Sequence, residues 1–525
     1  MIRPRHPFVR PDPSAGQPPR EEESFLSSKN WITILIVAGI VLRLAQYLAN
    51  RSLWLDESFL ALNIVNRSFG ELLQPLDYHQ GAPIGFLMAE KAAFLALGNN
   101  EYALRLFPLL SGISSMFFFA LLARQYLRPK AALIALGLFA VLPQLIYYSS
   151  EVKQYSSDVA IATLLYLVTM EAMRNNLSTA RAALIGFAGG TAIWFSHPAV
   201  FLLAGAGTTL LTCFLARKEW KKVGFLSVSF SIWCGSFAAL YFVSLRHLAS
   251  DQILTSYWDS GFAPFLPHSF GEFNWYIKAF FEIFNDPIGL KFQGLAAFAF
   301  LVGFIAVLSE KYENALLLSS PIVFALAASM LHKYPFKGRL MLFAVPALLL
   351  FIAAGTERVI KNMHQLSATI GYIFLGLLFL HPLYYSCTNL IHPQGREEIK
   401  PVMSYVMANR RPGDILYLYS GSRFAFRYYS ERYGFRESDY IVGVSSRDNW
   451  KTYDNDLDRL RGHKRVWVLF SHIWKNSGVD EEQYFLNHLS SIGTRLDAMK
   501  KNGAAVYLYD LGNNLATKKS QPSHR

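Results

Sequence analysis

Two adjacent carboxylates, Asp56 and Glu57, are the residues of this chain best placed for acid–base chemistry. They lie between Trp54 and Ser58 (WLDES), just after the first long apolar segment, residues 31–49. Charge close to hydrocarbon is costly and is usually kept for a function. One interpretation is a helix cap, because an Asp before a helical run accepts hydrogen bonds from free backbone N–H groups. The other is a general base that takes a proton from an attacking hydroxyl.

The composition places these carboxylates in a membrane protein. The chain has 525 residues, of which 52% are hydrophobic and 15% aromatic. A helix needs about 20 apolar residues to cross ~30 Å of hydrocarbon, and blocks near that length recur along the chain. The blocks are 31–49, 104–123, 131–148, 156–173, 182–197, 199–216, 223–245, 292–309, 314–331, 339–355 and 366–388. We therefore predict an α-helical polytopic membrane protein with about 11 transmembrane helices.

The net charge of +13 indicates topology, not nucleic-acid binding. Lys and Arg cluster in alternate loops, and such clusters favour the cytoplasmic side. The clusters are Arg124/Arg128/Lys130, Arg174/Arg181, Arg217/Lys218/Lys221/Lys222, Lys311 and Arg358/Lys361. An odd number of crossings puts them all on one side, with the N-terminus cytoplasmic and the C-terminus outside. We expect the location to be the inner (plasma) membrane.

Three regions follow from the change in composition along the chain. Residues 1–29 are rich in Pro, Arg and Glu and predict a disordered cytoplasmic tail. Residues 30–390 form the transmembrane domain, with long outside loops at 50–103 and 246–290. Residues 391–525 predict an extracytoplasmic α/β domain with a largely parallel sheet, because strands alternate with helices. The strands are expected at 414–420, 441–444, 465–470 and 504–509, and the helices at 422–433, 449–461 and 481–492.

Four further motifs follow WLDES in a fixed order: QGAPIGF from Gln80, EYALRLFP from Glu101, YSSEVKQY from Tyr148 and YPFKGR from Tyr334. Together the five motifs resemble the GT-C superfamily of polyprenyl-phosphate-dependent glycosyltransferases. Within it they are most similar to the family 39-like branch, which includes protein O-mannosyltransferases and lipid A aminoarabinose transferases. The resemblance covers residues 31–390 and implies a GT-C-like fold.

The resemblance also implies roles for individual residues. Asp56 would be the catalytic acidic residue that activates or orients the acceptor, and Glu57 would support it or bind the acceptor. The donor would be a lipid monophosphate sugar, whose leaving phosphate must be neutralised by cations. The donor phosphate-binding candidates are Lys153, Tyr155, Tyr334, Lys337 and Arg339. Arg339 is preferred to Lys337 because a guanidinium grips phosphate through two donors. For Lys153 an interfacial lysine that snorkels to water is the alternative.

Other polar residues of the outside loops are weaker candidates for acceptor or sugar binding: Asp77, His79, Gln80 and His197. Solvated loop residues, or a histidine satisfied within a turn, explain them equally well. They show no metal-ligand spacing, so we predict no obligatory metal and no cofactor, although a divalent cation is compatible with them. Arg43, inside the first span, is expected either to pair with an acid of the first loop or to act in catalysis.

We therefore expect an integral-membrane glycosyltransferase that moves a hexosyl or pentosyl group from a polyprenyl-phosphate donor. The acceptor would be an extracytoplasmic lipid, polysaccharide or protein, and membrane lipid would be the other partner. The alternative is a transporter or lipid flippase, which should carry acids or broken helices deep inside its spans. Here ionisable residues within the spans are few and the acids gather at one face.

Overall fold

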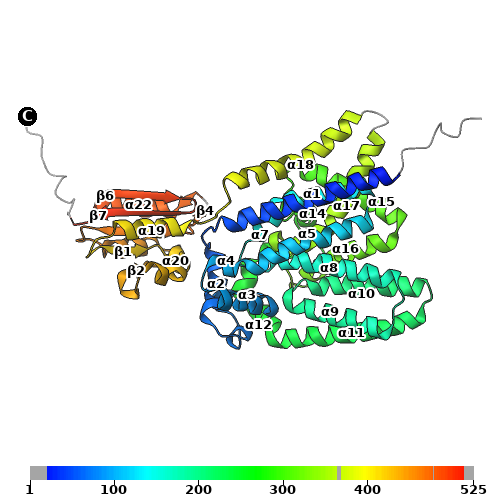
Figure 1. The fold of residues 1–525 in the computed structure, drawn as a ribbon. Helices are drawn as coiled ribbons and strands as arrows, with labels where there is room; N and C mark the ends of the chain where they lie inside the picture. Colours follow the sequence, from blue (N-terminus) through cyan, green and yellow to red (C-terminus); the bar gives the residue numbers. More distant parts are fainter. Residues whose placement is uncertain (1–20, 364–367, 477, 513–525) are drawn as a thin grey trace, which may run out of the picture.

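The computed structural model describes residues 21–363, 368–476 and 478–512. A long helical bundle lies beside a smaller sheet-containing domain, and residues of the first outside loop lie between the two (Figure 1). The tail predicted to be disordered lies outside the described residues up to residue 20. Its remainder is helical, because α1 begins at Glu21.

Within the described residues, nine helical segments are long and apolar enough to cross a membrane. They contain α1 (Glu21–Leu48), α5 (Leu106–Tyr126), α8 (Tyr155–Arg174), α10 (Ala199–Ala216), α11 (Trp220–Leu240) with η3 (Tyr241–Leu245) and α12 (Arg246–Ser250), α15 (Gln293–Glu310), α16 (Tyr312–Met330), η5 (Gly338–Ala344) with α17 (Val345–Met363), and α18 (Ala368–Ile391). Figure 1 shows them running roughly side by side.

The other two of the eleven expected spans are shorter helices. The first is α6 (Pro129–Val141) with α7 (Pro143–Tyr148), interrupted because Pro143 lacks a backbone N–H. The second is α9 (Thr179–Phe195). Lys153, which follows α7, contacts Asp56 of the first outside loop, and Asp251, which follows α12, contacts His79 of the same loop. If the nine long segments cross the membrane, these contacts require both short segments to cross as well, because otherwise the partners would lie on opposite faces.

Ion pairs gather the basic loops at the opposite end of the bundle. Arg128 and Arg358 both pair with Glu310, at 3.2 and 2.5 Å, and Arg217 pairs with Glu313 at 2.8 Å. The basic clusters after α5, α10 and α17 therefore share one end, as the positive-inside pattern predicts.

The orientation of the bundle is a testable prediction. A reporter fused at Arg10, which lies outside the described residues, should report a cytoplasmic location, and one fused at Trp467 should report an outside location. A cytoplasmic signal from the second fusion would contradict the eleven-crossing arrangement.

The first outside loop folds into short helices that lie against the bundle end. They are α2 (Leu55–Asn66), η1 (Glu71–Leu73), η2 (Asp77–His79), α3 (Ile84–Leu97) and α4 (Glu101–Leu104). As the length of its apolar run predicts, α3 does not span, and its Phe86 and Leu87 are buried. The second outside segment forms α13 (Gln252–Tyr257), η4 (Asp259–Gly261) and α14 (Phe270–Asn285), and α14 exposes an apolar stripe.

The C-terminal domain has a five-stranded mixed sheet in the order β2-β1-β3-β7-β6. The strands are β1 (Ile415–Leu418), β2 (Tyr440–Val442), β3 (Val466–Ser471), β6 (Thr494–Lys501) and β7 (Ala504–Asp510), with a small β4 (Lys475–Asn476) and β5 (Val479–Asp480) hairpin apart. β1 is parallel to β2 and β3, whereas β7 is antiparallel to β3 and β6. The expectation of a largely parallel sheet is wrong for the last two strands. A short turn through Gly503, with φ of +64°, returns the chain as a hairpin.

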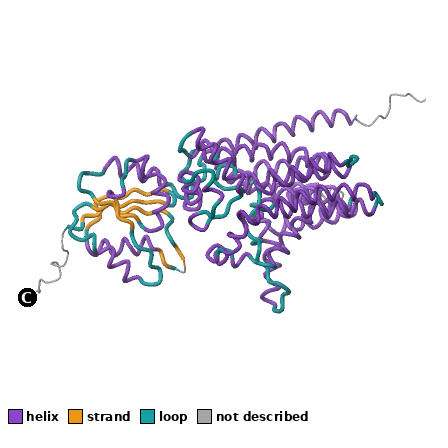
Figure 2. The backbone as a smooth tube through the Cα atoms, turned by 90° about the horizontal axis from the view of Figure 1, so that it is seen from below, coloured by secondary structure: helices purple, strands orange, loops and turns teal. Residues whose placement is uncertain are grey.

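Helices cover both faces of this sheet: α19 (Ile399–Asn409), α20 (Arg423–Ser430), α21 (Trp450–Asp458) and α22 (Glu481–Ile492). Figure 2 shows the strands between helices, next to the bundle end. One apolar core joins the domain to the first outside loop, and in it Leu53 and Phe86 share a cluster with Ile399, Phe426 and Trp467. The α/β domain is therefore packed on the loop that carries Asp56.

Candidate active site

Helix α2 places Asp56 in its first turn. The helix follows Trp54, whose carbonyl accepts from the Ser58 N–H at 2.9 Å, and no side chain of the N-cap residue caps it. Instead, Glu397 accepts from the Leu55 N–H at 3.0 Å. The capping interpretation of Asp56 is therefore wrong, because a carboxylate from the other domain caps this helix and the Asp56 side chain points elsewhere.

The Asp56 carboxylate lies between two cations from distant parts of the chain. Lys153, in the turn before α8, donates to Oδ1 at 2.9 Å, and Arg339, in η5, lies 2.8 Å from Oδ2. Lys153 also donates to Gln80 Oε1 at 2.7 Å. The Asp56 and Arg339 side chains remain 16% and 15% exposed, whereas that of Lys153 is 5% exposed. The Asp56 and Arg339 side chains are thus partly exposed, whereas Asp56 Oδ2 itself is buried.

These cations control the basicity of Asp56. Burial alone would raise the pKa of its carboxyl group, but Lys153 and Arg339 outweigh burial and hold the pKa below its usual value. Without substrate, Asp56 is consequently ionised at neutral pH and is a weak proton acceptor.

Aromatic rings surround the Arg339 guanidinium. Its central carbon lies 5.7 Å from the Trp54 ring centre, 5.5 Å from Tyr155 and 5.7 Å from Trp258. Cations within about 6 Å of such rings are attracted by their negative faces. Tyr155, predicted to contact phosphate, thus contributes its ring to the position of Arg339.

Glu57 contacts a different set of partners from its neighbour Asp56. Its side chain is fully buried and accepts from Arg105 Nε at 2.9 Å and Nη2 at 2.8 Å. The Val152 N–H also donates to it, at 2.9 Å. Burial would raise its pKa, but Arg105 and Arg51 more than offset that effect and lower it. Glu57 thus holds α2 against the Lys153 turn and does not reach the exposed side of Asp56.

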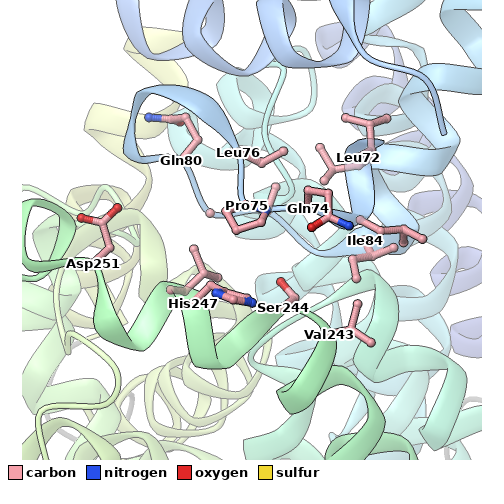
Figure 3. Close-up of a pocket in the computed structure, with 15 residues that line it drawn as sticks. Leu72, Gln74, Pro75, Leu76, Gln80, Ile84, Val243, Ser244, His247 and Asp251 are labelled. Atoms are coloured by element: carbon pink, nitrogen blue, oxygen red, sulfur yellow. The ribbon is translucent and has the colours of Figure 1, made fainter. Parts of the chain in front are cut away.

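Gln80, which accepts a hydrogen bond from Lys153, also lines a small pocket. The pocket lies between residues 72–87 of the first outside loop and the segment 243–251, and its volume is about 50 Å³. In Figure 3 Gln80, Pro75 and Leu76 lie across from His247 and Ser244. Its lining is mostly apolar with a few polar groups, a composition typical of small-molecule sites.

The remaining first-loop candidates take part in separate contacts. Asp77 pairs with Arg67 at 3.0 Å and is largely exposed. His79 Nδ1 lies 2.9 Å from Asp251 Oδ2 at the pocket edge. His197 contacts neither the Asp56 carboxylate nor the pocket lining. Within the described residues, no three His, Cys, Asp or Glu side chains are arranged to hold a metal ion.

The Tyr334–Arg339 motif divides between two environments. The Tyr334 hydroxyl donates to the Leu340 carbonyl at 2.7 Å, and its ring packs on Phe201, so this tyrosine braces the turn. Lys337 is exposed and donates to Ser260 Oγ at 2.9 Å. Of this motif, only Arg339 contacts Asp56.

Comparison with known proteins gives a family match over part of the chain and a shared fold. A family model of dolichyl-phosphate-mannose-protein mannosyltransferases matches residues 81–248. The structure of ArnT from Cupriavidus metallidurans bound to undecaprenyl phosphate is 12% identical, with a TM-score of 0.54, over 91% of this chain and 98% of that chain. The same protein in the apo state gives a TM-score of 0.51 at 11% identity, over 92% and 98% of the two chains. The chain therefore shares the fold of the ArnT structures.

The chain is also similar to the crystal structure of the Archaeoglobus fulgidus oligosaccharyltransferase in complex with Zn and sulfate. That structure is 14% identical, with a TM-score of 0.50, over 83% of this chain and 67% of that chain. Comparison by sequence with curated proteins finds no match.

Arg43 takes neither expected role. It is 1% exposed, and its guanidinium donates to the carbonyls of Gly39, Phe139 and Ala140 at 2.9–3.4 Å. Phe139 and Ala140 lie in the last turn of α6, where carbonyls lack partners and a positive charge is stabilising. Arg43 therefore caps the helix that the Pro143 break leaves open.

Four residues near the site were not among the residues predicted from the sequence. The buried Glu151 accepts from the Trp54 indole N–H at 2.8 Å, and Asp286 lies beside Gly338. Burial raises the pKa of both carboxyl groups. Arg396 and Glu397 come from the segment between α18 and α19. Glu151 lies inside a quoted motif, but the other three are brought close only by the tertiary fold.

Proposed function

We propose that this protein is a GT-C-like glycosyltransferase that transfers one sugar from a polyprenyl-phosphate donor to a hydroxyl acceptor at the outer face of the membrane. One observation carries the proposal: Asp56, Lys153 and Arg339 converge at a partly exposed point at one end of the spans. The arrangement supplies a proton acceptor and two cations, which are the groups that this reaction requires. The ArnT structure bound to undecaprenyl phosphate supports the donor class.

The proposed reaction is a single displacement. The acceptor oxygen forms a bond to the anomeric carbon while the bond from that carbon to the phosphate oxygen breaks. The lipid phosphate leaves with the electron pair, the acceptor proton passes to Asp56, and the anomeric configuration inverts. Lys153 and Arg339 neutralise the departing phosphate.

Donor binding would also change the pKa of Asp56. In the structure Asp56 forms ion pairs with both Lys153 and Arg339, and these pairs lower its pKa. A donor phosphate would compete for the same cations and weaken their hold on the carboxylate. The pKa of Asp56 would then rise toward the range useful for catalysis, because the ideal base has a pKa near the operating pH.

The pocket beside Gln80 is our proposed entry for the acceptor. Gln80 lines this pocket and also accepts a hydrogen bond from Lys153, so it connects the pocket to the Asp56 cluster. His79 and Asp251 stand at the pocket edge, where they would meet polar groups of the acceptor or sugar.

Mass spectrometry of cell-envelope glycans tests the proposal. Envelopes from cells with and without the gene are compared, and deletion should remove one sugar from a lipid, polysaccharide or protein. Complementation with wild-type protein should restore it, whereas the Asp56→Asn variant should not. Identical glycan profiles in all strains would contradict the proposed activity.

The phosphate clamp can be tested on purified protein. Lys153→Ala and Arg339→Ala should each weaken use of a polyprenyl-phosphate sugar, because a hydrogen bond to a charged group contributes about 1.5–3 kcal/mol. The donor KM and kcat/KM are measured for each variant.

Lys337→Ala is the matched control for the clamp. Lys337 is a cation of the same motif that bonds to Ser260 and does not reach Asp56, so its loss should change donor use much less. Unchanged donor kinetics in both clamp variants, or an equal effect in the control, would refute the assignment.

A further inference from the structure

The segment joining the two domains places another cation beside the site. Arg396 lies between the end of α18 and the start of α19. Its guanidinium carbon is 4.2 Å from the Trp54 ring centre and 4.8 Å from that of Tyr147. Arg339 lies 5.7 Å from the same Trp54 ring. Trp54 thus connects the linker arginine with the arginine that pairs with Asp56.

Arg396 differs from its neighbours in lacking a carboxylate partner. Lys153 and Arg339 share Asp56, and Arg105 is held by Glu57. Across the described ranges, no carboxylate oxygen lies within 4 Å of Arg396, and the residue is exposed. Its guanidinium forms a hydrogen bond with Tyr148 and interacts with Glu151 at longer range.

Arg51, the second arginine over Tyr147, is not an equivalent anion site. Its side chain is buried and donates to the Ser150 carbonyl. Arg396 is therefore the arginine of this pair that a solute can reach.

The charge balance of the proposed reaction calls for such a cation. The donor is a phosphodiester with a single negative charge, whereas the leaving lipid phosphate is a monoester with a charge of about −1.5 to −2 at pH 7. Lys153 and Arg339 together carry two positive charges, and Asp56 offsets one of them. A further cation that forms no ion pair would match the charge that develops on the leaving group.

We propose that Arg396 binds the phosphate of the lipid leaving group, so that the linker between the two domains forms part of the active site. This inference rests on the proposed function and assigns it a further binding residue. It also gives the α/β domain a role, because α19 and Glu397, which caps α2, fix the segment that carries Arg396.

Binding of undecaprenyl phosphate to the purified full-length protein tests this inference without requiring transfer. Arg396→Gln should weaken binding of this monoester by about 10-fold, the low end for a charge-assisted contact because the site is partly exposed. The KM for the diester donor should change less. Arg396→Lys keeps the charge and should retain most of the affinity, which separates charge from packing on Trp54.

Arg432→Gln is the matched control. Arg432 also joins the α/β domain to the first outside loop and stacks on a tyrosine, but it pairs with Glu101, away from Asp56. Its loss should leave binding of the lipid phosphate unchanged. Equal affinity in wild type and Arg396→Gln would overturn the inference, as would an equal loss in the control.

Two further measurements identify the source of the phosphate that Arg396 binds. Inorganic phosphate should compete poorly, and the KM for a phosphate-free acceptor should be the same in wild type and Arg396→Gln. A loss confined to an acceptor that carries phosphate would instead place the acceptor at Arg396 and overturn the inference. Wild-type protein that neither binds the lipid phosphate nor transfers sugar would contradict the proposed function itself.

Discussion

Asp56→Asn is expected to slow sugar transfer by roughly 10²–10⁴-fold, the usual cost of losing a general base. The substitution keeps the size of the side chain and an oxygen that Lys153 can contact. It removes the negative charge and the proton acceptor. Because Asp56 would no longer compete for Lys153 and Arg339, we expect the donor KM to stay constant or fall while kcat drops. Steady-state kinetics on purified protein measure both constants.

This opposite behaviour of kcat and KM separates the proposed roles. Loss of Lys153 or Arg339 should raise the donor KM, whereas loss of Asp56 should not. The pH dependence of kcat/KM, which reports the free enzyme, adds a second check. Asp56 has a pKa below its usual value and is ionised throughout the neutral range, so its titration should not appear in this profile near pH 7. Full transfer activity in folded Asp56→Asn protein would remove the catalytic assignment.

Much of the fold follows from local sequence signals. Each predicted span contains a helix, because apolar length alone marks a segment that must bury its backbone polar groups. The four predicted strands of the α/β domain also form, and each is rich in β-branched or aromatic residues. β6 was missed because it is a mostly exposed edge strand with the sequence TRLDAMKK, which carries no apolar alternation.

The site was less predictable, because its pairings are long-range. Asp56, Lys153 and Arg339 could be selected individually, since each is charged where a span meets the outside face. Their partners could not be derived in this way. Glu397 caps α2 from a linker 342 positions away, and no local pattern marks that contact. Arg396 and Glu397 were not predicted to lie near the site, because both fall in the part of the chain predicted to be a separate domain.

Glu57→Gln should destabilise the protein by about 3–5 kcal/mol, the cost of breaking a buried ion pair from one side. The reason is that Arg105, 2% exposed, would remain charged and unpaired inside the protein. The midpoint of thermal unfolding in detergent measures the change at pH 7. Asp56→Asn is the matched control, since it alters the adjacent, partly exposed carboxylate and should shift the midpoint much less.

The Glu57 effect should also depend on pH in a defined direction. Its pKa is lowered in the folded protein, so the stability gained from the pair is present above the unfolded value of about 4.3 and is lost as the pH falls through the lower folded value. The stability gap between wild type and Glu57→Gln should therefore narrow as the pH falls below about 4. The double variant Glu57→Gln/Arg105→Gln should recover part of the loss, because the unpaired charge is removed. A gap independent of pH and no recovery in the double variant would show that Glu57 does not act through Arg105.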